Sequence, residues 1–216
     1  MLAGCFWLAV GGTDAVRAQT AQTAQTAQTA PTAQTGTVAA DTFIQELSTD
    51  VLNTVKADKA IQGGDVAKVM ALVDSKVMPH VNFQRMTASA VGRYWRTATP
   101  EQQQRLQAEF KTLLVRTYSG ALAQVKDQAI ALKPLRSNPA DNEVVVRTEI
   151  KGKGEPIQLD YRLERTATGW KVYDFNVLGI WLVEQYRSSF AQEISTGGID
   201  GLIAKLAERN KTATKG

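Results

Sequence analysis

The residues that could do chemistry in this chain are few and far apart. The one histidine, His80, follows Pro79, and no cysteine or second histidine lies near it to form a metal site or a nucleophile–base pair. The sequence contains no GxSxG, HExxH, P-loop or GxGxxG motif. We therefore expect His80 to be a surface or helix-capping residue, and we expect no metal site, no cofactor and no enzymatic activity.

Two aspartates keep an enzymatic alternative open. Asp160 and Asp174 lie in or beside predicted strands, and a carboxyl group buried in a pocket can act as a base with a raised pKa. Asp160 falls on the polar face of its strand, where we expect contact with solvent. Asp174 has a second possible role, as a hydrogen-bond partner of the neighbouring backbone or of Arg187. A small pocket enzyme of the isomerase type therefore stays as the alternative function.

Arginine side chains could anchor a phosphate group, because a guanidinium donates two parallel hydrogen bonds to it. We place Arg187 first, as the headgroup candidate, since it lies one turn beyond an apolar run, and we expect most of the others to be solvated or paired with glutamate. The net charge is +4, and the basic residues are scattered rather than in blocks, which is unlike a nucleic-acid-binding arm. The candidates are Arg85, Arg93, Arg96, Arg147 and Arg187.

The most informative segment is residues 169–190, GWKVYDFNVLGIWLVEQYRSSF. Trp170, Val172, Phe175 and Val177 predict a strand with apolar groups on both faces, and the apolar residues that follow recur at the helical spacing of three and four. So much apolar surface either closes a core or lines a cavity for a hydrophobic ligand. For the cavity we predict the following lining residues: Phe110, Leu114, Tyr118, Val146, Leu159, Tyr161, Val172, Phe175, Trp181, Tyr186 and Phe190.

Helical patterns dominate the first half of the folded part. Apolar stripes predict helices over residues 43–55, 66–73 and 83–91, with Asp65 as the cap of the second. The clearest start signal is Thr99-Pro100-Glu101-Gln102, in which the threonine caps, the proline suits the first helical position and the glutamine completes a capping box. A long amphipathic helix is predicted to follow it.

Period-two patterns then replace the helical ones, which predicts a sheet. The fold class is therefore α+β: N-terminal helices packed on a curved, mostly antiparallel four-stranded sheet, of the NTF2-like or cystatin-like type, followed by C-terminal helices. The predicted strands are residues 130–132, 143–150, 157–164 and 170–177, and the predicted C-terminal helices are residues 180–190 and 199–206, with a break at Gly197-Gly198.

The 216 residues, 44% of them hydrophobic, are enough for one domain with a core of its own. We predict a signal peptide at residues 1–18, because an apolar run too short to span a bilayer precedes Val16-Arg17-Ala18, a candidate cleavage site. Residues 19–40 are predicted to be a low-complexity linker, since they consist largely of Ala-Gln-Thr repeats without large apolar side chains. The folded domain is predicted at residues 41–210, and a polar tail at residues 211–216.

The leader also leaves two alternatives open. Leu2-Ala3-Gly4-Cys5 matches a lipoprotein box, but the apolar run lies mostly after Cys5, which favours an ordinary signal peptide. No Lys or Arg precedes the run, so a start upstream of Met1 is open as well.

The chain resembles the MlaC family, whose members are also described as toluene-tolerance auxiliary proteins. Residues 169–190, followed by GIDGLIAKL at residues 198–206, resemble the C-terminal signature of this family. The pattern TxxQQxxxxxxFxxLLxxTY from Thr99 to Tyr118 resembles its central helix, and residues 83–95 resemble the preceding segment. The resemblance covers residues 41–207.

This resemblance implies a monomeric periplasmic carrier that holds phospholipid acyl tails between sheet and helices, with the headgroup toward solvent. It implies partners as well: an inner-membrane ABC lipid transporter complex and an outer-membrane lipoprotein–porin complex, between which lipid is shuttled to maintain outer-membrane lipid asymmetry. Trp181 stands where many members have Ser, and Gln185 where many have Asn. We expect a tryptophan there to narrow or cap the pocket.

Overall fold

The computed structural model describes residues 38–138 and 140–212. The predicted signal peptide, the Ala-Gln-Thr repeats and residues 213–216 of the predicted tail lie outside these ranges. In chain order the elements are α1 (Ala40–Ala57), α2 (Lys59–Gln62), α3 (Val66–Leu72), a π-helical turn η1 (Val73–Val77), a 3₁₀ turn η2 (Met78–His80), α4 (Phe83–Val91), η3 (Gly92–Thr97), α5 (Pro100–Ala123), β1 (Ala129–Leu132), β2 (Glu143–Lys151), β3 (Ile157–Thr166), β4 (Gly169–Val177), β5 (Ile180–Trp181) and α6 (Leu182–Thr212).

The helix starts follow the capping signals of the sequence. At α5, the Thr99 hydroxyl accepts the backbone N–H of Gln102 at 3.2 Å, and the backbone N–H of Thr99 donates to the Gln102 side chain at 3.0 Å, which completes the predicted capping box. Asp65 caps α3 by accepting from two backbone N–H groups, as predicted. The helix α4 has the predicted bounds, residues 83–91, and its cap is the side chain of Asn82.

The sheet is an antiparallel meander in the order β1-β2-β3-β4-β5. It contains the four predicted strands and one more, because the chain after β4 turns back before the helix begins. Leu178 and Gly179 form this turn with φ values of 53° and 88°, and the two residues of β5 then pair with the end of β4. Our prediction of four strands was therefore one short, and the α+β class is confirmed. The likeness to NTF2-like or cystatin-like folds stays a prediction.

A β-bulge, in which Tyr173 is the extra residue of β4, corrects the prediction that β4 is apolar on both faces. The pairing shifts between Arg162 and Leu163, so that Val172 faces Leu163 while Phe175 faces the Tyr161 position. This shift changes which residues of β4 share a face. As a result the apolar residues of β4 all lie on the sheet face that carries the apolar side chains of β3, and the opposite face is polar.

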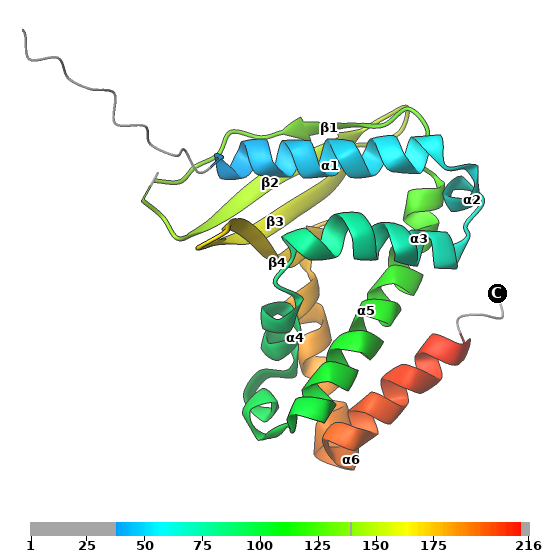
Figure 1. The fold of residues 1–216 in the computed structure, drawn as a ribbon, viewed down its shortest axis with the longest axis vertical. Coiled ribbons are helices and arrows are strands. Elements are labelled where there is room, and N and C mark those ends of the chain that lie inside the picture. Colours follow the sequence, from blue (N-terminus) through cyan, green and yellow to red (C-terminus); the bar gives the residue numbers. More distant parts are fainter. Residues whose placement is uncertain (1–37, 139, 213–216) are drawn as a thin grey trace, which may run out of the picture. The chain divides into compact units, whose positions relative to one another are not determined.

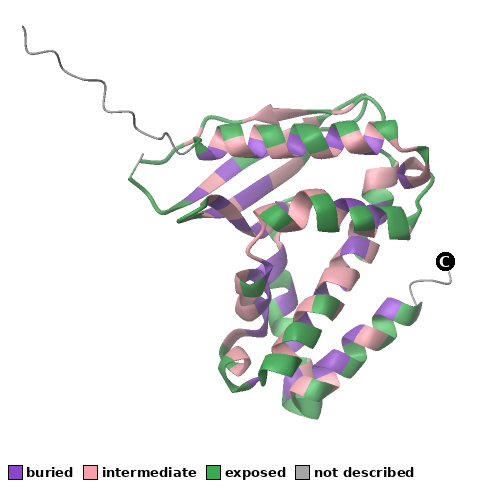
Figure 2. Cartoon of the chain, viewed as in Figure 1, coloured by how far each residue is buried: buried purple, intermediate pink, exposed green. Residues whose placement is uncertain are grey.

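The helices cover that apolar face and extend away from it (Figure 1). The buried residues of α1 recur every three or four positions, from Ala40 to Val55, along one side of the helix (Figure 2). Ala40 and Ile44 pack on the sheet, whereas Leu52 and Val55 pack with α2, α3 and α5. The helix α6 has two segments, because Gly198 takes a non-helical conformation with φ 68° and ψ −173°; this is the predicted break. No helix in residues 38–138 or 140–212 is both long and apolar enough to cross a bilayer.

Candidate functional site

The buried apolar residues that the structure describes form three separate clusters instead of one. Buried apolar residues usually form one contiguous core in a domain, with smaller satellite clusters. The first cluster lies among α4, α5 and α6, the second lies between α1 and the sheet, and the third lies among α1, α2, α3 and α5. Half-buried apolar side chains lie at the borders of all three clusters.

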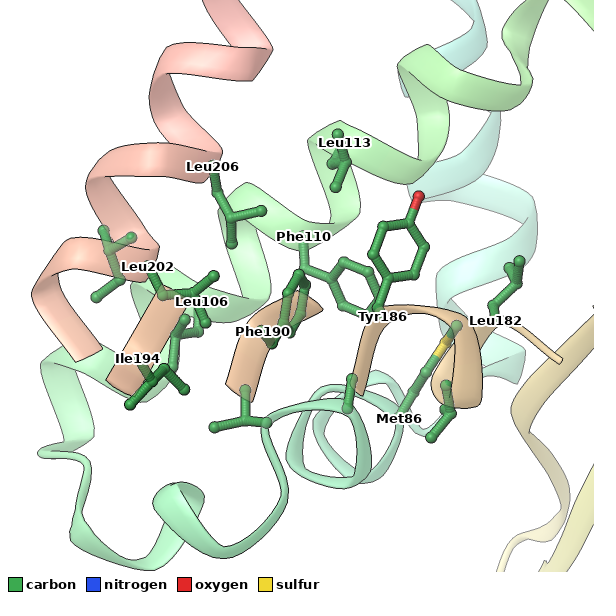
Figure 3. Packing of buried hydrophobic residues seen from close by; sticks show 14 of the residues in the cluster. Met86, Leu106, Phe110, Leu113, Leu182, Tyr186, Phe190, Ile194, Leu202 and Leu206 are labelled. Atoms are coloured by element: carbon green, nitrogen blue, oxygen red, sulfur yellow. The ribbon is translucent and has the colours of Figure 1, made fainter. Parts of the chain in front are cut away.

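Three predicted lining residues pack together inside the first cluster (Figure 3). The ring centroid of Phe110 lies 5.0 Å from that of Tyr186 and 5.2 Å from that of Phe190, in edge-to-face contacts. Phe110 and Phe190 are fully buried. Their aromatic contacts join α5 to α6, so these residues position the helices of the site.

Three others lie in the second cluster, beneath α1. Val146, Tyr161 and Val172 are buried on the apolar face of the sheet. The Tyr161 hydroxyl shares a hydrogen bond of 3.1 Å with Ser48 of α1, and burial raises the pKa of Tyr161 to about 12. Because the two hydroxyl groups are hydrogen-bonded to each other, their burial between α1 and the sheet destabilises the fold little.

The remaining apolar candidates other than Trp181 are half-buried and pack against the edges of the first or the second cluster. Leu114 and Tyr118 lie one turn apart on α5 and pack against the first cluster. Leu122 continues the same face of α5 by one more turn and packs against the third cluster. We call these three residues the α5 stripe.

A matching row crosses the apolar face of the sheet. Leu132 of β1 pairs with Thr148 of β2, Thr148 with Leu159 of β3, and Leu159 with Val177 of β4. The three aliphatic side chains, Leu132, Leu159 and Val177, are half-buried, and we call them the apolar row. Phe175, next to this row, packs against both the first and the second cluster. The α5 stripe, the apolar row and Phe175 form the candidate site.

Sequence reasoning missed Leu122, Leu132 and Val177 as members of this site. The four-residue spacing from Tyr118 was a signal for Leu122. The period-two pattern was a signal for Val177, but the bulge hid which face of the sheet this residue occupies.

The structure does not bring Trp181 together with the candidate site. Trp181 pairs with Asn176, and the guanidinium of Arg162 lies 3.9 Å above its ring. Arg162 follows Tyr161 in β3, so its side chain lies on the polar face of the sheet. Trp181 therefore stacks with Arg162 on the polar side of the sheet. Its pairing with Asn176, whose side chain is also on that side, places it there.

Arg187 lies on the exposed side of α6, where its Nε donates to the carbonyl of Ser89 at 3.1 Å. It makes no hydrogen bond with Asp174, and our alternative of an Asp174–Arg187 pair was wrong. Arg85 is paired with glutamate, as expected: it binds Glu143 at 2.7 Å and also Glu164.

Asp174 is 1% exposed, and both of its carboxylate oxygens accept hydrogen bonds from within the fold. One carboxylate oxygen accepts the backbone N–H of Phe175 at 2.9 Å and that of Val183 at 3.1 Å; the other accepts Arg162 at 2.9 Å. Burial raises the pKa of Asp174, while the backbone hydrogen bonds and Arg162 oppose that rise. The carboxylate thus positions the first turn of α6.

Asp160 is 3% exposed, and our expectation of solvent contact was wrong. Its carboxylate accepts the backbone N–H of Thr148 at 3.2 Å and the Gln158 amide at 2.6 Å, and these hydrogen bonds take the place of water. His80 packs edge-on against Phe43 at 5.5 Å, and burial lowers its pKa. No group of three or more potential metal ligands occurs among residues 38–138 and 140–212.

The family model described as MlaC protein matches residues 45–208. The toluene tolerance protein ttg2D of Pseudomonas putida is 28% identical over 187 residues, which cover 82% of this chain and 87% of that protein. The intermembrane phospholipid transport system binding protein MlaC of Haemophilus influenzae is 23% identical over 169 residues, or 76% of this chain and 79% of that protein.

A solved structure is similar in fold as well as in sequence. The phospholipid-binding protein of Ralstonia solanacearum, in complex with a phospholipid, is 48% identical and has a TM-score of 0.80, over 82% of this chain and 99% of that one. The family match extends over most of the described chain and includes every residue of the candidate site. This chain therefore belongs to the MlaC protein family.

Proposed function

We propose that this protein binds a phospholipid, with the acyl tails between the α5 stripe and the apolar row. The observation that carries the proposal is the set of half-buried apolar side chains, on α5 and on the sheet, that pack against the edges of the three buried clusters. The names of its relatives support the choice of ligand, since one of them was solved with a phospholipid bound.

The physical chemistry of such a site is that of hydrocarbon burial. Each methylene removed from water contributes about 0.8 kcal/mol, so two acyl chains gain enough to stay in an apolar site instead of in solution. The same gain makes unassisted release slow, because affinity differences act mostly on the dissociation rate. A carrier of this kind therefore needs its site to open when it delivers lipid.

The proposal extends to the cellular role. The protein acts as a monomeric periplasmic carrier between an outer-membrane lipoprotein–porin complex and an inner-membrane ABC transporter complex, and it thereby maintains the lipid asymmetry of the outer membrane. No chemical step is required, and Asp174, the strongest candidate for a catalytic base, has its carboxylate engaged by the fold. Arg187 stays a candidate contact for the headgroup, since it lies on the exposed side of α6.

Native mass spectrometry of the protein purified from a Gram-negative host tests the proposal. We expect a species heavier than the protein by one or more phospholipids, and solvent extraction should identify the same lipids. After delipidation, the protein should take up phospholipid again from vesicles of phosphatidylethanolamine and phosphatidylglycerol. A protein that carries no lipid and takes none up would overturn the proposal, as would release of free fatty acids from the vesicles.

A further inference from the structure

One segment of the chain contacts all three buried clusters, and we call it the strap: residues 66–81, comprising α3, η1, η2 and Val81. Val69 and Leu72 belong to the third cluster. Met78 packs against the first cluster, and Val81 packs against the first and the second. The residues of the candidate site pack against the edges of the same three clusters, so the strap and the candidate site share these borders.

The hydrogen-bond pattern of the strap changes twice within a few residues. It starts as the α-helix α3, widens to the π-helical turn η1 at Val73–Val77 and tightens to the 3₁₀ turn η2. The Ser75 hydroxyl donates to the carbonyls of Ala71 and Leu72, at 2.8 and 3.3 Å. No residue of η1 or η2 is fully buried. Short π and 3₁₀ turns of this kind often mark hinges, because their hydrogen bonds are less favourable than those of an α-helix.

The two ends of the strap are held by the backbone. The N–H of Asp65, just before the strap, donates to the carbonyl of Ala60 in α2 at 3.0 Å, and the N–H of Asn82, just after the strap, donates to the carbonyl of Val172 at 2.8 Å. The middle is held by two ion pairs, Lys76 with Asp50 of α1 at 2.9 Å and Asp74 with Lys111 of α5 at 2.7 Å. These side chains are between 27% and 51% exposed, so both ion pairs are weak compared with the attachments at the ends.

We infer that the strap is the gate through which hydrocarbon enters and leaves the candidate site. In the closed state the two ion pairs connect the strap to α1 and α5. In the open state both ion pairs are broken and η1 is rearranged, which exposes the α5 stripe while the ends of the strap stay attached. This inference rests on the proposed function, because it requires that the candidate site holds lipid.

A reversible cross-link tests the gate. We would replace Asp50 and Lys76 by cysteine in the full chain, with Cys5→Ser, and join the two thiols by a short bis-maleimide that contains a disulfide. The matched control joins Lys205→Cys to Glu208→Cys, an exposed ion pair on α6 outside the strap. The measurement is the uptake rate of a fluorescent lysophospholipid, presented below its critical micelle concentration to delipidated protein.

The cross-linked strap should slow uptake by about tenfold or more, since lipid enters only through the open fraction of molecules. Reduction of the linker in the same sample should restore the rate, and the control pair should be unaffected. Equal uptake rates before and after reduction would overturn the gate while leaving the proposed function intact. If even the reduced, folded protein takes up no lipid, the proposed function itself fails.

Charge variants test the ion pair without a cross-link. Lys76→Gln should speed uptake by about two- to fivefold, the range expected for the loss of one exposed ion pair. The exchanged pair, Lys76→Asp with Asp50→Lys, should return the rate toward that of the unaltered protein. Equal uptake rates in all three proteins would count against the role of this ion pair as a latch.

Discussion

Replacing Leu159 by glutamate should abolish lipid binding while leaving the fold intact. Leu159 is half-buried in the middle of the apolar row. Full burial of a leucine side chain contributes about 1.5–3 kcal/mol to stability, so the substitution of this half-buried leucine should lower the free energy of unfolding by about 1 kcal/mol. A domain whose free energy of unfolding is about 5–15 kcal/mol stays folded after such a loss. A carboxylate held against hydrocarbon costs several kcal/mol, and about 3 kcal/mol already corresponds to a roughly hundredfold loss of affinity.

The same strand offers a matched control. Ile157 lies two residues earlier on the same face of β3 but is 42% exposed, so Ile157→Glu should keep its lipid. Val172 is unsuitable for this comparison because it is fully buried, and a charge there should unfold the domain. The assay is lipid content by native mass spectrometry, with circular dichroism to check the fold. A folded Leu159→Glu protein with its usual phospholipid would refute the assignment of the apolar row, and so would equal lipid loss in Ile157→Glu.

Three further predictions concern single polar residues. Asp174→Ala should lower the free energy of unfolding by about 2–5 kcal/mol, because it leaves the backbone N–H groups of Phe175 and Val183 without their acceptor. Asp174→Asn keeps an acceptor oxygen and should lose less in urea titrations; equal losses would contradict the hydrogen-bonding role. Folding lowers the pKa of His80, so its contribution to the free energy of unfolding is present above pH 6.5 and is lost as the pH falls through the folded-state pKa. His80→Gln should therefore make the free energy of unfolding fall less steeply on the acid side. An identical pH profile of stability in the two proteins would rule this effect out. Tyr161→Phe should lower the free energy of unfolding by roughly 1 kcal/mol, because it removes the hydrogen-bond partner of Ser48; an unchanged thermal transition would show that this hydrogen bond contributes nothing. Spectroscopic titration of the native protein should find no ionisation of Tyr161 below about pH 11.

The elements that the sequence predicted well are those specified by nearby residues. The capping box at Thr99 and the Asp65 cap join residues two or three positions apart, so the starts of α5 and α3 follow from the sequence alone. Strand alternation predicted β2 and β3 for the same reason. The turn at Leu178 escaped prediction, because a leucine with positive φ is rare and has no sequence signal.

The candidate site could be predicted only in part, since its geometry depends on pairing between distant residues. The sequence by itself determined the supply of apolar side chains, the family resemblance and the lack of a catalytic motif. Tertiary structure alone decided which side chains share a face: the bulge beside Arg162 and Leu163 places Val172 on the same face as Phe175, while Asp174 pairs with Arg162 on the opposite face. A shift of one residue in strand pairing reverses the face of every side chain that follows, and no local pattern specifies where that shift occurs.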